Sequence, residues 1–266
     1  MKRPRSSFKP LLQLAHELAD RSGQVILPHF RKAISIENKA GRGAFDPVTA
    51  ADRAAERTIV RLIGERFPDH GIVGEEYGDK AGSSPLKWII DPIDGTRAFI
   101  MGMPLWGTLI GLADGAEPIL GIMDQPFTRE RVWSAEAASY WRTGDGRPKR
   151  LATRACSRLA DAVLTTTHPD LLGEAELEPF MRVKAKARMT RYGGDCYAYA
   201  LLAAGFVDVV IEAGLKPYDI AALIPIVERA GGRVTTWDGK PATHGGRILA
   251  AGDPRLHAEA MKVLGQ

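Results

Sequence analysis

Apolar residues recur at helical spacing in the first part of the chain. Over residues 8–30 the stripe consists of Leu11, Leu14, Ala15, Leu18, Val25 and Ile26, which predicts a long amphipathic helix. A second stripe is made of Ala55, Ile59, Leu62 and Ile63. We expect this second helix to start at Asp46-Pro47-Val48-Thr49 and to end near Phe67-Pro68. Thr49 and Asp52 have the spacing of a capping box. Between the helices we expect a short strand at 34–37 and a loop at 41–43.

Short apolar runs bounded by turn residues then replace the helical pattern. Gly71–Gly74 and Trp88–Ile90 each predict a short strand. Four further runs are separated by turn signals such as Asp114-Gly115, which predicts an antiparallel meander. These runs are Trp106–Ala113, Ile119–Met123, Arg131–Ala135 and Ser139–Arg142.

The second half of the chain alternates between strand and helix patterns. Strands are predicted at 162–166, 183–189, 207–211, 233–235 and 248–250, and helices at 197–204, 220–230 and 254–264. Such alternation is typical of layered α/β folds. The Gly- and Pro-containing stretch 143–148 is the best candidate boundary. We therefore expect a mixed α/β protein with one unit over 1–145 and a second over 146–266.

Composition places the chain among soluble globular proteins. Its 266 residues are 45% hydrophobic and 26% charged, which suits a substantial buried core. The two cysteines, Cys156 and Cys196, do not suggest a disulfide scaffold and favour a reducing cytoplasm. No apolar run follows the basic start as in a signal peptide, and none is long enough to span a membrane.

The charge is mildly basic, at +4 with a pI of about 9.1. Such a surface could attract an anionic metabolite or nucleic acid. No stretch interleaves aromatic residues with Lys and Arg as in single-strand binders. We therefore expect no nucleic-acid partner, and we keep an RNA- or transcription-complex-binding protein as the non-enzymatic alternative.

The most informative stretch runs from Lys87 to Thr96 and reads K-W-I-I-D-P-I-D-G-T. Its apolar run predicts a buried strand that ends at Asp91, because Pro92 cannot donate to a ladder. Asp94-Gly95 is a turn signal. Two carboxylates beside a buried strand are costly unless something compensates them. Either a divalent cation binds both, or the acids cap backbone amides in an Asx-type turn.

Acidic residues occur at the ends of two further apolar segments. Glu75-Glu76 follows one predicted strand, and Asp219 follows Lys216-Pro217-Tyr218. Three segments that deliver carboxylates to strand ends are what a site for several cations needs. The six histidines are scattered, so we expect surface or structural roles for them: His16, His29, His70, His168, His244 and His257.

These motifs together resemble the inositol monophosphatase family of magnesium-dependent phosphatases. The resemblance rests on Gly74-Glu75-Glu76, on W-I-I-D-P-I-D-G-T from Trp88 to Thr96, and on P-Y-D-I-A-A from Pro217 to Ala222. D-P-V-T-A-A-D from Asp46 to Asp52 is similar to an upstream family element. Within P-Y-D-I-A-A, Tyr218 departs from the family pattern, because much of the family has Trp there. Gly43-Ala44-Phe45 also departs from the usual lysine-rich loop. The resemblance implies a layered αβαβα sandwich and a homodimer.

The resemblance also implies roles for individual residues. The magnesium ligands would be Glu75, Asp91, the carbonyl of Ile93, Asp94 and Asp219, holding two or three ions. Glu75 and Thr96 would orient the attacking water, and Asp52 would support Thr96 or metal-bound water. The residues themselves agree, because the backbone N–H groups of Gly95 and Thr96 would open a helix and bind phosphate.

Substrate choice is best read from Arg191 to Tyr199, R-Y-G-G-D-C-Y-A-Y. Inositol phosphatases usually carry a small residue where Asp195 falls. Asp195 and Glu212 would together suit a cationic leaving group, and the run is similar to the histidinol-phosphate phosphatase branch. Asp195 could also act only as a helix N-cap. Arg191 would pair with Asp195 or contact phosphate from a neighbouring subunit.

We therefore expect a phosphomonoesterase that hydrolyses L-histidinol phosphate, a step of histidine biosynthesis. The enzymatic alternative is a phosphatase for inositol 1-phosphate or another small phosphate ester.

Overall fold

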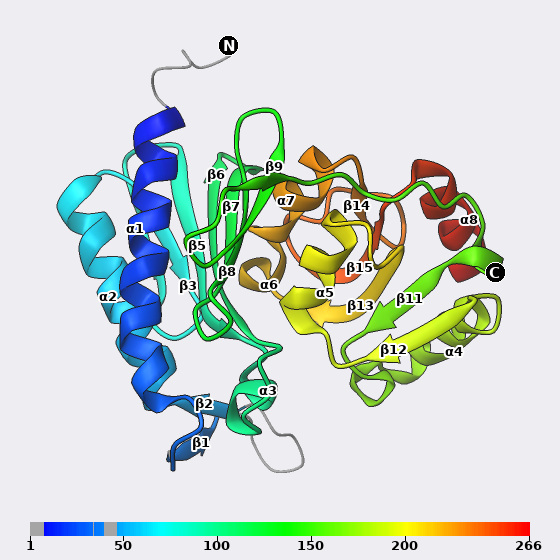
Figure 1. Ribbon diagram of the computed structural model, residues 1–266, viewed down its shortest axis with the longest axis horizontal. Coiled ribbons are helices and arrows are strands. Elements are labelled where there is room, and N and C mark those ends of the chain that lie inside the picture. The colour runs from blue at the N-terminus through cyan, green and yellow to red at the C-terminus, as the bar shows by residue number, and fades with distance from the viewer. Residues whose placement is uncertain (1–7, 34, 40–46) are drawn as a thin grey trace.

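The computed structural model describes residues 8–33, 35–39 and 47–266, which form five layers (Figure 1). Helices α1 and α2 cover one face of an eight-stranded sheet. Helices α5, α6 and α7 lie between this sheet and a five-stranded sheet, whose outer face carries α4 and α8. The predicted αβαβα arrangement is thus confirmed.

The first layer consists of the two helices that the apolar stripes predicted. Helix α1 (Phe8–Ile26) continues into the 3₁₀ turn η2 (Leu27–His29), and α2 runs from Ala50 to Arg66. The Thr49 hydroxyl accepts a hydrogen bond from the Ala51 N–H at 3.2 Å, and Asp52 accepts one from the Thr49 N–H at 2.9 Å. The capping box is therefore present and fixes where α2 begins.

The segment before α2 differs from the prediction. Pro47–Thr49 form the short strand β2, which pairs antiparallel with β1 (Ile36–Asn38), so the helix begins only at Ala50. Thr49 has extended backbone angles, as an N-cap residue requires. The expected loop at 41–43, the run Gly43-Ala44-Phe45 and Asp46 lie outside the described residues.

The larger sheet contains the predicted meander. Its order is β10-β9-β8-β7-β6-β5-β3-β4, with β3 and β5 parallel and every other neighbouring pair antiparallel. Its strands are β3 (Gly71–Gly74), β4 (Gly78–Lys80), β5 (Leu86–Asp94), β6 (Gly107–Asp114), β7 (Glu117–Gln125), β8 (Glu130–Ser134), β9 (Ser139–Thr143) and β10 (Lys149–Arg150). Helix α3 (Thr96–Ile100) follows β5 directly.

The smaller sheet has the order β12-β11-β13-β15-β14, with β11 parallel to β12 and β13. Its strands are β11 (Val163–Thr166), β12 (Met189–Tyr192), β13 (Val209–Leu215), β14 (Arg233–Thr236) and β15 (Gly246–Ala251). The helical segments around it are η3 (Leu159–Asp161), η4 (Pro169–Leu171), α4 (Glu174–Lys184), α5 (Asp195–Ala203), α6 (Pro217–Ile220), α7 (Leu223–Arg229) and α8 (Pro254–Leu264).

Two predictions in this half were wrong. The strand expected at 183–189 is the end of α4, a turn and only the first residue of β12. Apolar and basic residues alternate from Val183 to Met189, which imitates a strand, but Val183 packs with Phe180 on the buried side of α4. The helix expected at 220–230 begins only at Leu223. Ile220 is the last residue of α6, and Ala221 and Ala222 separate α6 from α7.

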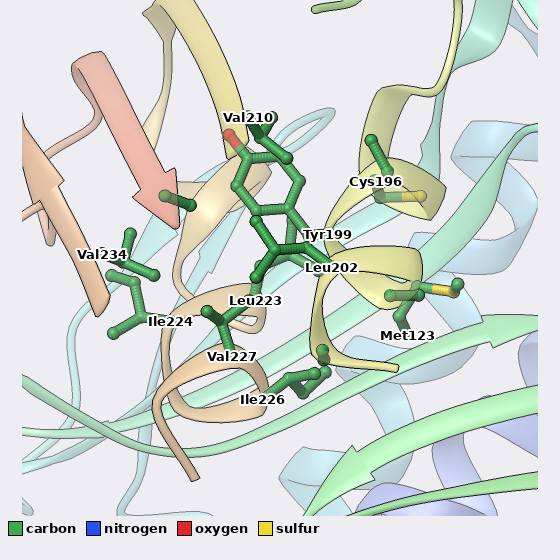
Figure 2. Packing of buried hydrophobic residues seen from close by; sticks show 14 of the residues in the cluster. Met123, Cys196, Tyr199, Leu202, Val210, Leu223, Ile224, Ile226, Val227 and Val234 are labelled. Carbon is green, nitrogen blue, oxygen red and sulfur yellow. The ribbon is translucent and has the colours of Figure 1, made fainter. Parts of the chain in front are cut away.

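The middle layer joins the two sheets through one apolar cluster (Figure 2). Cys196, Tyr199 and Leu202 come from α5, and they pack with residues of α7 and of both sheets. The helices approach the larger sheet closely at Gly121 of β7, where an added Cβ would lie 1.8 Å from the carbonyl oxygen of Ala222. A side chain at this point of β7 would therefore push away the segment that links α6 and α7.

Other expectations concern the chain as a whole. Among the described residues, no helix combines the length and the apolar character needed to cross a membrane. Cys156 and Cys196 are both buried free thiols. The larger sheet takes its strands from residues 71–150 and the smaller one from 163–251. The division into units 1–145 and 146–266 stays a prediction.

Candidate active site

Three carboxylates from both halves of the chain meet between the sheets. Asp91, Asp94 and Asp219, hereafter the cation cluster, each place an oxygen within 4.8 Å of the others. Burial, and then the neighbouring carboxylates, raise the pKa of Asp91 and Asp94 well above the usual range. Burial also raises the pKa of Asp219 to about 7. Closely spaced hard oxygen atoms in this environment fit a divalent cation, which would compensate their mutual repulsion.

Strand β5 holds two of these carboxylates through an irregularity. The strand continues to Asp94, so the prediction that it ends at Asp91 was wrong, but its register with β6 shifts between Asp91 and Asp94. Thr108 of β6 donates its hydroxyl to the Pro92 carbonyl at 2.9 Å, and the Ile93 N–H donates to the Asp91 carboxylate at 3.0 Å. Pro92 interrupts the pairing, and the irregularity brings Asp91 and Asp94 to the same site.

Asp219 reaches the cluster from α6. Its carboxylate accepts the Lys216 N–H at 2.6 Å, and Pro217 occupies the first helical position, where its missing donor costs nothing. Tyr218, which stands where much of the family has Trp, packs against the small apolar cluster of Ile89, Ala113 and Ala221.

Glu75 lines the same cavity from the end of β3. The Lys39 ammonium lies 2.7 Å from a Glu75 oxygen and 2.8 Å from a Glu76 oxygen. The buried carboxylate of Glu56 in α2 accepts the Glu76 N–H at 2.8 Å and the Tyr77 N–H at 3.0 Å. Glu56 therefore fixes the turn that presents Glu75.

Of the residues predicted to assist catalysis, Thr96 lies in the cavity wall and Asp52 lies outside it. Thr96 lines the cavity and donates its hydroxyl to the Ile93 carbonyl at 3.0 Å. Asp52 is buried in the first turn of α2, where its carboxylate accepts from Thr49. Burial raises the pKa of Asp52 to about 6. Asp52 is not part of the cavity wall, and its role behind Thr96 stays a prediction.

Gly95 creates space beside the cluster. Its φ of +81° is a left-handed conformation that favours glycine. An added Cβ would lie 2.9 Å from the Leu105 carbonyl oxygen and 3.3 Å from the Asp195 Cβ. Helix α3 has only five residues, so its dipole contributes little. A phosphate cradle here would consist of the N–H groups of Gly95 and Thr96 themselves.

Asp195 lines the cavity at the start of α5. Its φ of +44° is unusual for a residue other than glycine. The N-cap alternative for its side chain finds no support, because the Asp94 carboxylate, and not that of Asp195, accepts the Cys196 N–H, at 2.7 Å. This bond ties the cation cluster to α5.

The other two predicted substrate contacts differ in their placement. Glu212 is buried and lines the cavity. Its carboxylate accepts three hydrogen bonds, from the Thr166 hydroxyl at 3.2 Å, the Thr167 N–H at 2.7 Å and the Thr167 hydroxyl at 3.1 Å. Arg191 lies exposed on β12, the edge strand of the smaller sheet, and does not line the cavity.

Sequence reasoning missed part of the cavity, whose volume is about 690 Å³. Arg97 lines it directly after Thr96, and its position next to the motif was a usable signal. His168, Asp170 and Leu171 also line it. His168 is exposed and caps η4 by accepting the Asp170 N–H, as a surface or structural histidine was expected to, although it also borders the cavity.

Comparison with known proteins agrees with this geometry. The sequence model of the inositol monophosphatase family matches residues 8–266. The chain belongs to this family. Relatives that are 35% identical are named phosphatases, and we conclude that the chain is a metal-dependent phosphoric monoester hydrolase.

Individual family members differ in the substrates that their names state. The bifunctional phosphatase IMPL2, chloroplastic, of Arabidopsis thaliana is 43% identical over 94% of this chain and 74% of its own length. A histidinol-phosphatase of Chlorobaculum parvum is 35% identical over 96% of this chain and 97% of its own. The solved structure of an inositol monophosphatase from Zymomonas mobilis is 39% identical with a TM-score of 0.86, covering 98% of this chain and 100% of that one. Family membership therefore defines the reaction but leaves the ester open.

Proposed function

We propose that this family member hydrolyses L-histidinol phosphate to L-histidinol and phosphate in histidine biosynthesis. The observation that carries the proposal is the position of Asp195, whose Cβ lies 3.3 Å from where a Cβ on Gly95 would be. An acid therefore adjoins the predicted phosphate cradle, so that a leaving group attached to the bound phosphate lies beside this acid. The named histidinol-phosphatase at 35% identity supports the same substrate.

The chemistry follows from groups that meet at the cation cluster. Two or three magnesium ions, held by Glu75, Asp91, the Ile93 carbonyl, Asp94 and Asp219, would supply Lewis-acid activation of water and of the phosphate. Glu75 and Thr96 orient the attacking water, and Asp52 supports Thr96 from behind. The N–H groups of Gly95 and Thr96 bind the phosphate oxygens, which holds the ester in line for attack.

The leaving group lies toward Asp195 and Glu212. L-Histidinol carries an amine and an imidazole, and a carboxylate within a few ångströms attracts such cations strongly in a partly dry site. Glu212 holds Thr167 through two hydrogen bonds and Thr166 through a third, and so shapes this side of the cavity. We further infer a cytoplasmic homodimer, in which the exposed Arg191 of one subunit reaches the neighbouring site.

The main competing substrate is inositol 1-phosphate, the kind of ester that the name of the Zymomonas mobilis relative suggests. Its leaving group is an uncharged polyol, which gains nothing from an acid at position 195. Charge on the leaving group therefore separates the two candidates more sharply than size does.

A substrate panel tests the proposal directly. Phosphate release is measured with histidinol phosphate, inositol 1-phosphate, fructose 1,6-bisphosphate and a 3′-phosphoadenylate, with magnesium and then with a chelator. We expect the highest kcat/KM for histidinol phosphate and loss of all activity with the chelator, restored by added magnesium. A higher kcat/KM for inositol 1-phosphate would refute the proposed substrate, while leaving the phosphatase reaction in place.

A further inference from the structure

The cavity is wider than the cation cluster and the phosphate cradle require. Beyond them its lining includes Thr167 and His168, which connect β11 to the 3₁₀ turn η4, and Asp170 and Leu171 of η4 itself. We call the segment Thr167–Leu171 the outer wall. Because it lines the same cavity as Asp195, a leaving group that extends past the phosphate comes within reach of this segment.

Glu212 fixes the beginning of the outer wall. Its buried carboxylate accepts both the N–H and the hydroxyl of Thr167. These bonds use the Glu212 oxygens on the protein itself, since the Thr166 hydroxyl binds the second oxygen. Another acid is therefore better placed to meet a cation in the open part of the cavity.

Asp170 has a carboxylate that is open to solvent. Its side chain is 88% exposed, and within the described part of the chain it contacts the His168 ring at 3.5 Å. The Nδ1 atom of that ring accepts the Asp170 N–H at 3.2 Å. The ring nitrogen of His168 thus serves the Asp170 backbone N–H, while the Asp170 carboxylate itself faces solvent.

Asp195, in contrast, already has a cationic neighbour. Burial raises the pKa of Asp195 to about 6, and the nearby Arg97 guanidinium opposes this rise. The positive charge of Arg97 offsets part of the negative charge of Asp195 in the electrostatic field of the cavity. Asp170 adds a second negative charge on this side.

We propose that the outer wall selects the leaving group, and that Asp170 favours phosphate esters whose leaving group carries a positive charge. This inference rests on the proposed function, because histidinol phosphate is such an ester. Asp170 acts on the side of the substrate that faces away from the phosphate, so it changes substrate binding and leaves the chemical step unaffected. The effect is modest, because an exposed carboxylate is screened by water and salt.

The test compares two esters in two variants of the full-length enzyme. For Asp170→Asn we expect the KM for histidinol phosphate to rise about two- to fivefold at low salt, with kcat unchanged. Asp170→Lys adds repulsion, so its KM rises further. For inositol 1-phosphate, whose leaving group is neutral, KM stays within error in both variants. The difference between the two esters shrinks as ionic strength increases.

A matched control comes from the helix that follows the outer wall. Glu174 is exposed in the first turn of α4 and does not line the cavity. Glu174→Gln removes the same charge, and we expect both KM values to remain at wild-type level. An unchanged KM for histidinol phosphate in Asp170→Asn and Asp170→Lys would overturn the inference, and so would an equal rise for both esters. The proposed function fails separately, if the wild-type enzyme does not prefer histidinol phosphate.

Discussion

The cation cluster and the outer wall line one cavity but are held in different ways. Each carboxylate of the cluster accepts a backbone N–H, from Ile93, Cys196 or Lys216. The outer wall is fixed at Thr167 by Glu212, while the Asp170 carboxylate further along is 88% exposed. The groups placed for chemistry are thus fixed by main chain within a partly buried site, whereas Asp170 of the outer wall faces solvent. Substitutions in the first region should abolish the reaction, and those in the second should change its preference.

The largest effect is expected at the cluster itself. Asp94→Asn removes a carboxylate that belongs to the cation cluster and also accepts the Cys196 N–H. Loss of a supporting group around a metal typically costs 10- to 100-fold, so loss of a ligand should lower kcat/KM by more than about 100-fold on every ester. Asp238→Asn, at an exposed residue paired with Lys240, serves as the control. Near-wild-type activity in Asp94→Asn would show that the cation cluster does not perform the reaction, which would contradict the difference drawn between the two regions.

The next effect concerns the packing that brings Asp219 to the cluster. Gly121→Ala places a Cβ 1.8 Å from the Ala222 carbonyl oxygen, and overpacking of this kind costs about 1–3 kcal/mol or more. We expect a lower melting temperature and a weaker apparent affinity for magnesium, since Asp219 lies on the adjoining α6. As a control, Gly64→Ala introduces a Cβ into open space on α2 and should stabilise by about 0.5–1 kcal/mol. Equal melting temperatures in the two variants would contradict the close contact.

A smaller effect distinguishes the anchor of the outer wall from the cluster. Burial raises the pKa of Glu212 to about 7 from its ordinary 4.5. The folded protein then keeps a proton that the unfolded chain releases, so this carboxyl lowers the free energy of unfolding as pH rises from about 4.5 to 7. Glu212→Gln does not titrate. Its melting temperature relative to wild type should therefore increase between about pH 5 and pH 8, by a few degrees, in the presence of a chelator.

The opposite pH trend, with the variant losing stability relative to wild type toward pH 8, would show that the charged form of Glu212 is the stable one. The hydrogen bonds from Thr166 and Thr167 would then outweigh the cost of burying the charge.

The smallest effect compares two tyrosines on α5. The Tyr197 hydroxyl bonds to Glu130, whereas the buried Tyr199 hydroxyl has no hydrogen-bond partner among the described residues. A buried unpaired polar group costs about 1–3 kcal/mol, and a paired one contributes about 1 kcal/mol. We expect Tyr197→Phe to lower the melting temperature and Tyr199→Phe to leave it equal or raise it. A larger loss in Tyr199→Phe would indicate that its hydroxyl has a bound partner.

The contrast between the two regions also explains what the sequence could reveal. W-I-I-D-P-I-D-G-T placed Asp91 and Asp94 together because a strand, a proline and a turn act within ten residues. The capping box at Thr49 was readable for the same reason. The outer wall was not, because His168 and Asp170 enter the cavity through the docking of β11 against β13 and the hydrogen bonds of Glu212. Such long-range placement leaves no local pattern.

Local patterns also misled where tertiary packing prevailed. The alternation from Val183 to Met189 fits a strand, yet the contacts of Phe180 and Val183 favour a helix. Likewise, Pro92 was expected to end β5, but Thr108 satisfies the Pro92 carbonyl and the strand resumes at Asp94. Both errors arose where contacts between separate elements, α4 with α8 and β5 with β6, decided the local structure.

The central claim is that an acid beside the phosphate cradle selects the ester, while the cation cluster performs the reaction. The most direct test is the ratio of kcat/KM for histidinol phosphate to that for inositol 1-phosphate in Asp195→Ala. Truncating a carboxylate that faces a cation in a partly buried site should reduce this ratio by about tenfold or more, with the inositol 1-phosphate rate maintained. An unchanged ratio would contradict the account, since Asp195 would then have no part in choosing the substrate.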